Sequence, residues 1–214
     1  MIDPLNITNF DRTDAELEEV MLFWICVAGK KSSTIAPRLD KVLSTLRDWN
    51  PIYTYYNPLA LIRSFHKWYL IQLLRENGIG CYNMKASAML QLAWKVTCNL
   101  NLRTCSAEEL MEIKGIGWIT ARCFIIHSRR DSRYAGLDTH ILHFLHDCGY
   151  NCPRTTPSSK KEYLKWEQIL LRHIDYIGIS VAEFDLAIWT AYSQKDEEGK
   201  NAFLRIYAAR EVVG

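Results

Sequence analysis

Long apolar runs are absent from this sequence, and none approaches the roughly 18 residues that a membrane-spanning helix needs. Residues 1–12 also lack the charged-then-apolar layout of a secretion signal, and an acid stands at Asp3. Internal repeats and low-complexity segments are missing as well. These absences predict a soluble, intracellular protein with no membrane partner.

Excess charge is missing too, because 26 lysines and arginines stand against 24 aspartates and glutamates. The formal net charge of +2 is compatible with DNA binding through a local basic patch, but it does not indicate DNA by itself. The charged fraction of 23% is ordinary, so we expect no disorder away from the ends.

Apolar and aromatic residues are abundant: 49% of the 214 residues are hydrophobic and 12% are aromatic. A chain of this composition can bury a substantial core and fold alone, and its length does not require a second domain. We predict one globular domain over residues 1–214, with a charged, flexible segment at about 194–200.

The seven cysteines are an odd number, spread through segments with helical patterns. This distribution favours a reduced protein with buried thiols. Cys148 and Cys152 form a close pair, but no second pair has matching spacing, and a zinc site needs four ligands. We predict no metal and no other cofactor.

Helix starts are marked by capping boxes, in which Ser or Thr is followed three positions on by Glu. Apolar residues recur behind these boxes at helical spacing, and no run of strict alternation is bounded by turns. The pattern predicts an all-α protein of roughly eight to ten helices with short links. The boxes are Thr13/Glu16, Ser106/Glu109, Ser159/Glu162 and Ser180/Glu183, and Asn57-Pro58 adds a further cap.

The stretch 106–130 has the pattern of two helices joined by a tight turn. A helix capped at Ser106 stops at Lys114–Gly117, and a second helix begins near Trp118. The two glycines allow the backbone to reverse with φ > 0, and Ile116 between them is expected to tuck between the helices. Bare N–H groups at the start of the second helix favour a phosphate oxygen. Gly-x-Gly alone is equally typical of an ordinary helix–helix turn.

Two further motifs flank this hairpin. Gly136-Leu-Asp-Thr-His-Ile141 begins 19 residues after Gly117, and Ile79-Gly-Cys-Tyr-Asn-Met-Lys-Ala86 precedes the hairpin. In order and spacing the three motifs resemble the helix-hairpin-helix (HhH-GPD) DNA glycosylase superfamily, over about Leu17 to Leu145. The resemblance implies that superfamily's all-helical fold, an aspartate loop at 136–141, and DNA as the partner.

Asp138 has two interpretations, and both can hold. As the N-cap of the following helix it would accept hydrogen bonds from bare N–H groups, as in any all-α protein. In the resembled superfamily the matching aspartate faces a base flipped out of DNA and acts at the reacting centre. That resemblance makes Asp138 the principal catalytic candidate, whereas His140 and His143 are predicted to be packing or surface residues.

The sequence departs from the superfamily in two places. Bifunctional members carry a lysine nucleophile just after the second glycine of the hairpin, where Trp118-Ile119-Thr120 stands here. A lysine Schiff-base lyase step is therefore not expected. The cysteine quartet that binds an iron–sulfur cluster in some members is also absent, so no cluster is predicted.

Three segments, Phe23–Lys30, 153–163 and 183–189, resemble one subgroup. They are similar to the bacteriophage DNA-base hypermodification proteins, also called amino acid:DNA transferases or thymine pyrophosphorylases. In that subgroup a phosphorylated 5-hydroxymethyluracil in DNA loses phosphate or pyrophosphate as an amine attacks its exocyclic methylene, and the glycosidic bond is kept. The resemblance implies a free amino acid or polyamine as co-substrate and, for a phage-encoded protein, a location in the host cytoplasm.

The subgroup chemistry suggests roles for further residues. An aspartate near the base could accept the proton of the amine, and Lys30 could offset charge on the leaving phosphate. The alternative for Lys30 is a positive charge at a helix C-terminus. The residues assigned to the substrate pocket are Trp24, Gly29, Asp185 and Trp189, although Trp189 is equally typical of core.

Contacts to the DNA backbone are expected from the hairpin and from the helix start before it. Lys160 lies in the first turn of a helix, where positive charge is slightly unfavourable, which hints at a phosphate partner, although a solvated charge is the equal alternative. Chemistry on a duplex base requires its extrusion into a pocket. The residues assigned to DNA binding are Lys114, Gly115, Ile116, Gly117, Ile119, Thr120, Tyr82, Lys85 and Lys160.

Three functions stay open at this point. The first is a thymine hypermodification transferase, which the subgroup resemblance favours. The second is a monofunctional DNA glycosylase, in which Asp138 would stabilise an oxocarbenium-like sugar and direct a water. The third is a non-catalytic DNA-binding module, against which the intact Asp138 argues, because phosphate binding needs only the hairpin.

Overall fold

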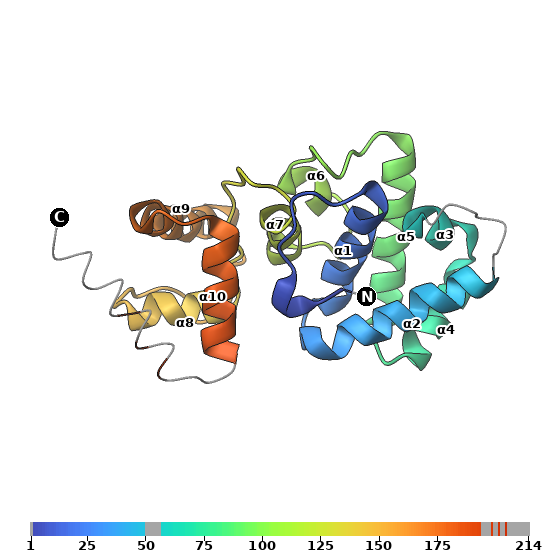
Figure 1. Ribbon diagram of the computed structural model, residues 1–214, viewed down its shortest axis with the longest axis horizontal. Coiled ribbons are helices and arrows are strands. Elements are labelled where there is room, and N and C mark those ends of the chain that lie inside the picture. Colours follow the sequence, from blue (N-terminus) through green and yellow to red (C-terminus); the bar gives the residue numbers. More distant parts are fainter. Residues whose placement is uncertain (1, 50–56, 194–197, 199–200, 202–203, 205–214) are drawn as a thin grey trace. The chain divides into compact units, whose positions relative to one another are not determined.

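The computed structural model describes residues 2–49 and 57–193, together with 198, 201 and 204 (Figure 1). Within these residues the regular elements are ten α-helices and one short 3-10 helix, without strands, which confirms the all-α prediction. None of the described helices is long and apolar enough to cross a membrane. The predicted flexible segment at 194–200 lies, residue 198 aside, outside the described residues.

The chain divides into two compact units, Met1–Phe124 and Ile125–Gly214. Helix α7 (Trp118–Ile126) crosses from the first unit into the second, and the prediction of a single domain stays a prediction. The first unit holds η1 (Pro4–Asn6), α1 (Asp14–Val27), α2 (Ser32–Trp49), α3 (Pro58–Ser64), α4 (Lys67–Glu76), α5 (Tyr82–Cys98) and α6 (Ala107–Met111). The second holds α8 (Thr139–Asp147), α9 (Lys160–Ile177) and α10 (Val181–Ser193).

The predicted caps begin the helices that they were expected to begin. Reciprocal capping boxes are present at Thr13/Glu16 before α1 and at Ser106/Glu109 before α6. The Asn57 side chain accepts a hydrogen bond from the Ala60 N–H at 2.8 Å and starts α3. Each of these caps satisfies an N–H group that the first helical turn leaves without a backbone partner.

Helix α1 packs against three other helices of the first unit, α2, α3 and α5. Its residues are buried on more than one face, which is typical of a helix surrounded by others. The carboxylate of Glu18 is buried with it and accepts a hydrogen bond from the Leu59 N–H at 2.9 Å, which ties α1 to the start of α3. Val20, Met21, Leu22, Phe23, Ile25 and Cys26 are each at most 2% exposed.

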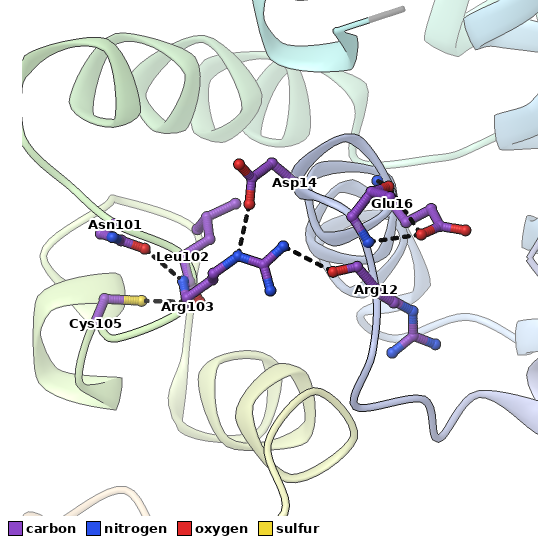
Figure 2. A network of polar contacts seen from close by, with 8 residues as sticks. Arg12, Asp14, Glu16, Asn101, Leu102, Arg103 and Cys105 are labelled. Carbon is purple, nitrogen blue, oxygen red and sulfur yellow. Dashed lines mark hydrogen bonds and ion pairs between the residues drawn. The ribbon is translucent and has the colours of Figure 1, made fainter.

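An arginine network fixes the start of α1 (Figure 2). Arg103 donates to Asp14 Oδ1 at 2.7 Å and to the Arg12 carbonyl at 2.8 Å. Arg12 in turn donates to the carbonyls of Asn9, at 2.7 Å, and Ile7. The segment before α1 is thereby held to the loop after α5, and α1 is held at the end opposite to Gly29 and Lys30.

The second unit is built on the packing of α8 against α10, with α9 also in contact with α10. The rings of Phe144 and Phe184 meet edge to face, with centroids 5.3 Å apart. The Tyr192 hydroxyl donates to Asp147 Oδ2 at 2.7 Å and joins the far ends of these two helices. The other end of α8, its N-terminus, is capped by Asp138.

Four of the seven cysteines are buried, and Cys81 and Cys98 are exposed. All seven are free thiols in this structure. Burial of Cys26 raises its pKa to about 12, so this thiol stays protonated and behaves as an apolar core residue.

Candidate active site and DNA interface

The turn between α6 and α7 has one glycine that the backbone requires. Gly115 has φ +104°, and a Cβ there would lie 3.2 Å from Met84 Cγ and 3.3 Å from Ala88 Cβ on α5. The expectation of positive φ at both glycines is wrong for Gly117, which is outside the positive-φ region and has open space around its Cα. Ile116 is 5% exposed and is tucked into the hairpin as predicted.

The outer surface of this turn offers N–H groups and one lysine. Among the described residues, the backbone N–H groups of Gly115 and Gly117 have no hydrogen-bond partner in the protein. The Lys114 side chain is exposed beside them. Because α7 starts directly after Gly117, the turn presents the positive end of a helix dipole, which favours an anion.

The start of α7 is held by a fully buried arginine. Arg122 lies over the Trp118 ring, 4.6 Å from its centroid, and its Nη2 is 3.9 Å from Glu108 Oε1 on α6. These contacts fix the angle between the two helices of the hairpin. Thr120 is 7% exposed, so its side chain packs inside, whereas Ile119 is half-buried. The DNA contacts expected at these two residues stay predictions.

Lys85 is the clearest correction among the predicted DNA contacts. Its side chain is 1% exposed, and its Nζ donates to the Cys26 carbonyl at the end of α1 and to the Ile79 carbonyl at 3.3 Å. Burial lowers the pKa of this amine. Lys85 joins the end of α1 to the turn before α5 and is not available to a phosphate.

The other candidates of the first unit surround that same turn. Lys30 and Gly29, which has φ +68°, are exposed directly after α1, and Trp24 is half-buried with its ring edge against Phe23. A Cβ at Gly80 would lie 2.8 Å from Lys30 Cε, so the lysine stem runs along the turn before α5. Tyr82 is half-buried beneath the Arg75 guanidinium, which is 4.6 Å from its ring centroid.

Asp138 is the N-cap of α8. Its backbone is extended, with φ −79° and ψ −178°, and its Oδ1 accepts a hydrogen bond from the Ile141 N–H at 2.9 Å. The capping interpretation is confirmed by this geometry. The cap also fixes the carboxyl at the positive end of a helix, with one defined orientation.

The loop that leads into Asp138 is held by side chains from α9 and the segment before it. The buried Tyr163 hydroxyl accepts from the Leu137 N–H at 3.0 Å and donates to the Ala135 carbonyl at 2.9 Å. Glu167 Oε1 accepts from the Ala135 N–H at 2.9 Å, and Thr156 Oγ1 donates to the Leu137 carbonyl at 2.9 Å. These four bonds make residues 135–137 a fixed support for Asp138.

The protonation of Asp138 is unusual for a carboxyl. Burial, and secondly the nearby charge of Asp185, raise the pKa of Asp138 to about 7. Hydrogen bonds from the backbone N–H groups of Ile141 and His140 act in the opposite direction. At neutral pH this carboxyl is therefore present in both forms and can accept or release a proton. Burial lowers the pKa of the neighbouring His140.

Asp185 comes from α10 and is paired with a histidine that the sequence analysis did not single out. The imidazole of His127, which is 1% exposed, lies directly after α7, and its Nε2 is 3.1 Å from Asp185 Oδ2. His127 follows an apolar run, and nothing local distinguishes it from a core histidine. Its partner lies 58 residues away, so only the folded chain reveals the pair.

The candidate residues are thus distributed over both units. Asp138 and Asp185 belong to the second unit, where Trp189 is half-buried one turn after Asp185, and Lys160 is exposed in the first turn of α9. The second predicted catalytic residue, Lys30, belongs to the first unit with the hairpin. Within the second unit, Asp185 is the side chain whose charge raises the pKa of Asp138.

The all-helical fold of this chain matches that of solved DNA glycosylases, as the sequence motifs led us to expect. No protein-family model matches the sequence. An 8-oxoguanine glycosylase/lyase of Methanocaldococcus jannaschii, solved with a 15mer DNA containing 8-oxoguanine, is 21% identical with a TM-score of 0.65, and the match covers 88% of this chain and 86% of that chain. The 8-oxoguanine DNA glycosylase of Thermotoga maritima is 22% identical with a TM-score of 0.63, over 84% of this chain and 80% of that chain. At this level of identity the likeness establishes the fold.

Proposed function

We propose that this protein is an enzyme that modifies a base in DNA and that Asp138 exchanges the proton at the reacting centre. The observation that carries the proposal is a carboxyl held rigidly at a helix start with its pKa raised to about 7. General acid–base groups work best when their pKa lies near the working pH. A carboxyl that served only as a helix cap would gain nothing from such a shift.

DNA as the substrate is supported by the first unit. The hairpin offers the Gly115 and Gly117 N–H groups, the positive end of α7 and the exposed Lys114, a combination that suits phosphate oxygens. One solved structure of the same fold holds DNA with an oxidised base. These contacts read the backbone, so affinity is expected to depend strongly on salt and little on sequence.

The reaction that we propose first is amine transfer onto a phosphorylated 5-hydroxymethyluracil. The amine nitrogen forms a bond to the exocyclic methylene carbon while the carbon–oxygen bond breaks, and the electron pair leaves with phosphate or pyrophosphate. Asp138 takes the proton that the nitrogen loses, and Lys30 offsets charge on the leaving group. The support for this reaction is the resemblance of Phe23–Lys30, 153–163 and 183–189 to the hypermodification proteins.

The second candidate reaction is base excision by a monofunctional glycosylase, which the fold match favours. In that reaction ionised Asp138 stabilises the positively charged sugar and directs a water to it. Trp118-Ile119-Thr120 stands where a lyase would carry its lysine, so cleavage of the DNA strand through a Schiff base is not expected in either case.

Mass spectrometry of nucleosides and free bases separates these functions. The protein is incubated with DNA that carries uracil, 5-hydroxymethyluracil or its phosphorylated form, with and without a mixture of amino acids and polyamines. A heavier, intact nucleoside that forms only with amine establishes the transferase. A released base and an abasic site establish the glycosylase instead. Binding without any product from these substrates contradicts the enzyme proposal and favours a DNA-binding module.

A further inference from the structure

The second unit brings three titratable side chains together from separate elements. Asp138 lies at the start of α8, Asp185 lies in the first half of α10, and His127 lies directly after α7. The Asp185 side chain is 15% exposed and that of His127 is 1% exposed. The contact between them, 3.1 Å from Nε2 to Oδ2, is therefore largely shielded from water, where a charge-assisted hydrogen bond is strongest.

Helix α10, which carries Asp185, packs against α8, and the charge of Asp185 acts on the start of α8. The charge of Asp185 affects two groups there, because it raises the pKa of Asp138 and opposes the lowering of the His140 pKa. A carboxylate accepts and cannot donate, so the contact requires a proton on His127 Nε2. With Oδ2 bound in this way, the carboxyl is held against His127 and has little freedom to turn.

We propose that His127 and Asp185 are positioning residues for the chemistry at Asp138: the buried imidazole fixes the Asp185 carboxyl, and the fixed carboxyl sets how readily Asp138 takes up a proton. The role rests on the proposed function of Asp138. The principle is that of a carboxyl pair, in which one ionised member makes ionisation of the other harder. Neither His127 nor Asp185 needs to touch the reacting atoms for this effect.

The other groups around Asp138 are accounted for by different contacts. His140 on α8 has its pKa lowered by burial and by His143, so its neutral form is favoured. From α9, Glu167 is bound to the Ala135 N–H and Tyr163 to the backbone on either side of Gly136. Asp185 is the one charged side chain whose effect on Asp138 is resolved among the described residues.

The test is a carbon-13 NMR titration of the aspartate carboxyls in the full chain without DNA, with Asp138→Asn used to assign the Asp138 signal. The wild type should titrate near pH 7 at this position. In Asp185→Asn, which is isosteric, the midpoint should fall by about one pH unit or more, since a like charge is removed. His127→Gln keeps a donor near the Nε2 position and should retain the wild-type midpoint, whereas the shorter His127→Asn should move it toward that of Asp185→Asn. His143→Gln, exposed on α8, is the matched control and should not shift it.

A midpoint in Asp185→Asn within about 0.3 pH units of the wild type would overturn the inference, given that shifts from close like charges are larger. So would equal midpoints in His127→Gln and His127→Asn. If His127→Asn does not fold, Asp185→Asn and His127→Gln decide the outcome. The titration needs no substrate, so it is separate from the proposed function, which fails if Asp138→Asn keeps its turnover. Where turnover is measured, Asp185→Asn should move the acid limb of kcat/KM for DNA to lower pH.

Discussion

Tyr163→Phe is the perturbation that most clearly isolates the support of Asp138. The Tyr163 hydroxyl is fully buried and makes two bonds to the loop, accepting from Leu137 N–H and donating to the Ala135 carbonyl. Phenylalanine keeps the ring and its packing and removes only the oxygen. The Leu137 N–H and the Ala135 carbonyl are then buried without the Tyr163 hydroxyl as their partner, and bulk water does not take its place.

The magnitude follows from these two groups. Each buried polar group left without a partner costs about 1–3 kcal/mol, so the loss of both bonds should lower the free energy of unfolding by about 2–6 kcal/mol. That loss is a large share of the roughly 5–15 kcal/mol that stabilises a typical domain. Because residues 135–137 precede the catalytic candidate, turnover should fall as well, by roughly tenfold or more, since a small misplacement of a reacting group is costly. DNA affinity should stay as it is, because the hairpin is untouched.

Urea unfolding followed by circular dichroism measures the stability change, and Tyr176→Phe is the matched control. Tyr176 lies on the same helix, α9, is 50% exposed, and should tolerate the change within about 0.5 kcal/mol. A loss below about 1 kcal/mol in Tyr163→Phe, close to that of the control, would contradict this expectation, because the two buried bonds would then contribute almost nothing.

Three further predictions concern other features of the two units. The Asp138 carboxyl, whose folded pKa is raised from 3.8 to about 7, contributes stability that is fully present below about pH 4 and is lost as pH rises through 7. Asparagine can still cap α8, so Asp138→Asn should stabilise the protein by about 2–4 kcal/mol at pH 8 and hardly at pH 4. Thermal melts at the two pH values measure this difference. Gly115→Ala should lower the free energy of unfolding by roughly 1–2 kcal/mol and Gly117→Ala by little, because only Gly115 has positive φ and close neighbours; equal losses in urea titrations would contradict this. Lys114→Ala should reduce the slope of log affinity for DNA against log salt by about one, whereas Lys85→Met should leave that slope unchanged and destabilise the fold, as fluorescence anisotropy and melting can show together.

Much of the fold could be predicted from the sequence because its helix starts are encoded locally. Thr13 and Ser106 cap helices with a glutamate three residues on, and both boxes form as predicted. Asp138 was identified as both cap and catalytic candidate, and the cap is confirmed. These caps depend only on residues that are close in the sequence, so they can be predicted without knowing the tertiary contacts.

Other features depend on partners that are distant in sequence. A lysine such as Lys85 is normally exposed, and only the meeting of α1 with the turn before α5 supplies the carbonyls of Cys26 and Ile79 that make its burial tolerable. Helix α2 includes Pro37 in its second turn, where local rules predict an interruption. Packing of α2 against α1 and α3 outweighs that preference.

The candidate site also combines features that the sequence predicts with features that depend on distant partners. The sequence predicts the aspartate, but its raised pKa depends on burial and on Asp185, which reaches it from α10. Neither the His127–Asp185 contact nor the Tyr163 bonds to the loop can be derived from spacing, because each joins segments separated by 26 residues or more. The raised pKa of Asp138 is thus a property of the folded second unit.

The most direct test of the central claim is a side-by-side measurement of DNA affinity and product formation in Asp138→Asn and Asp131→Asn. Asp131 is an exposed aspartate of the same unit and serves as the matched control. We expect both variants to bind DNA as the wild type does, and Asp138→Asn alone to lose product formation, by about 100-fold or more. Product formed by Asp138→Asn at the rate of the control would contradict the claim.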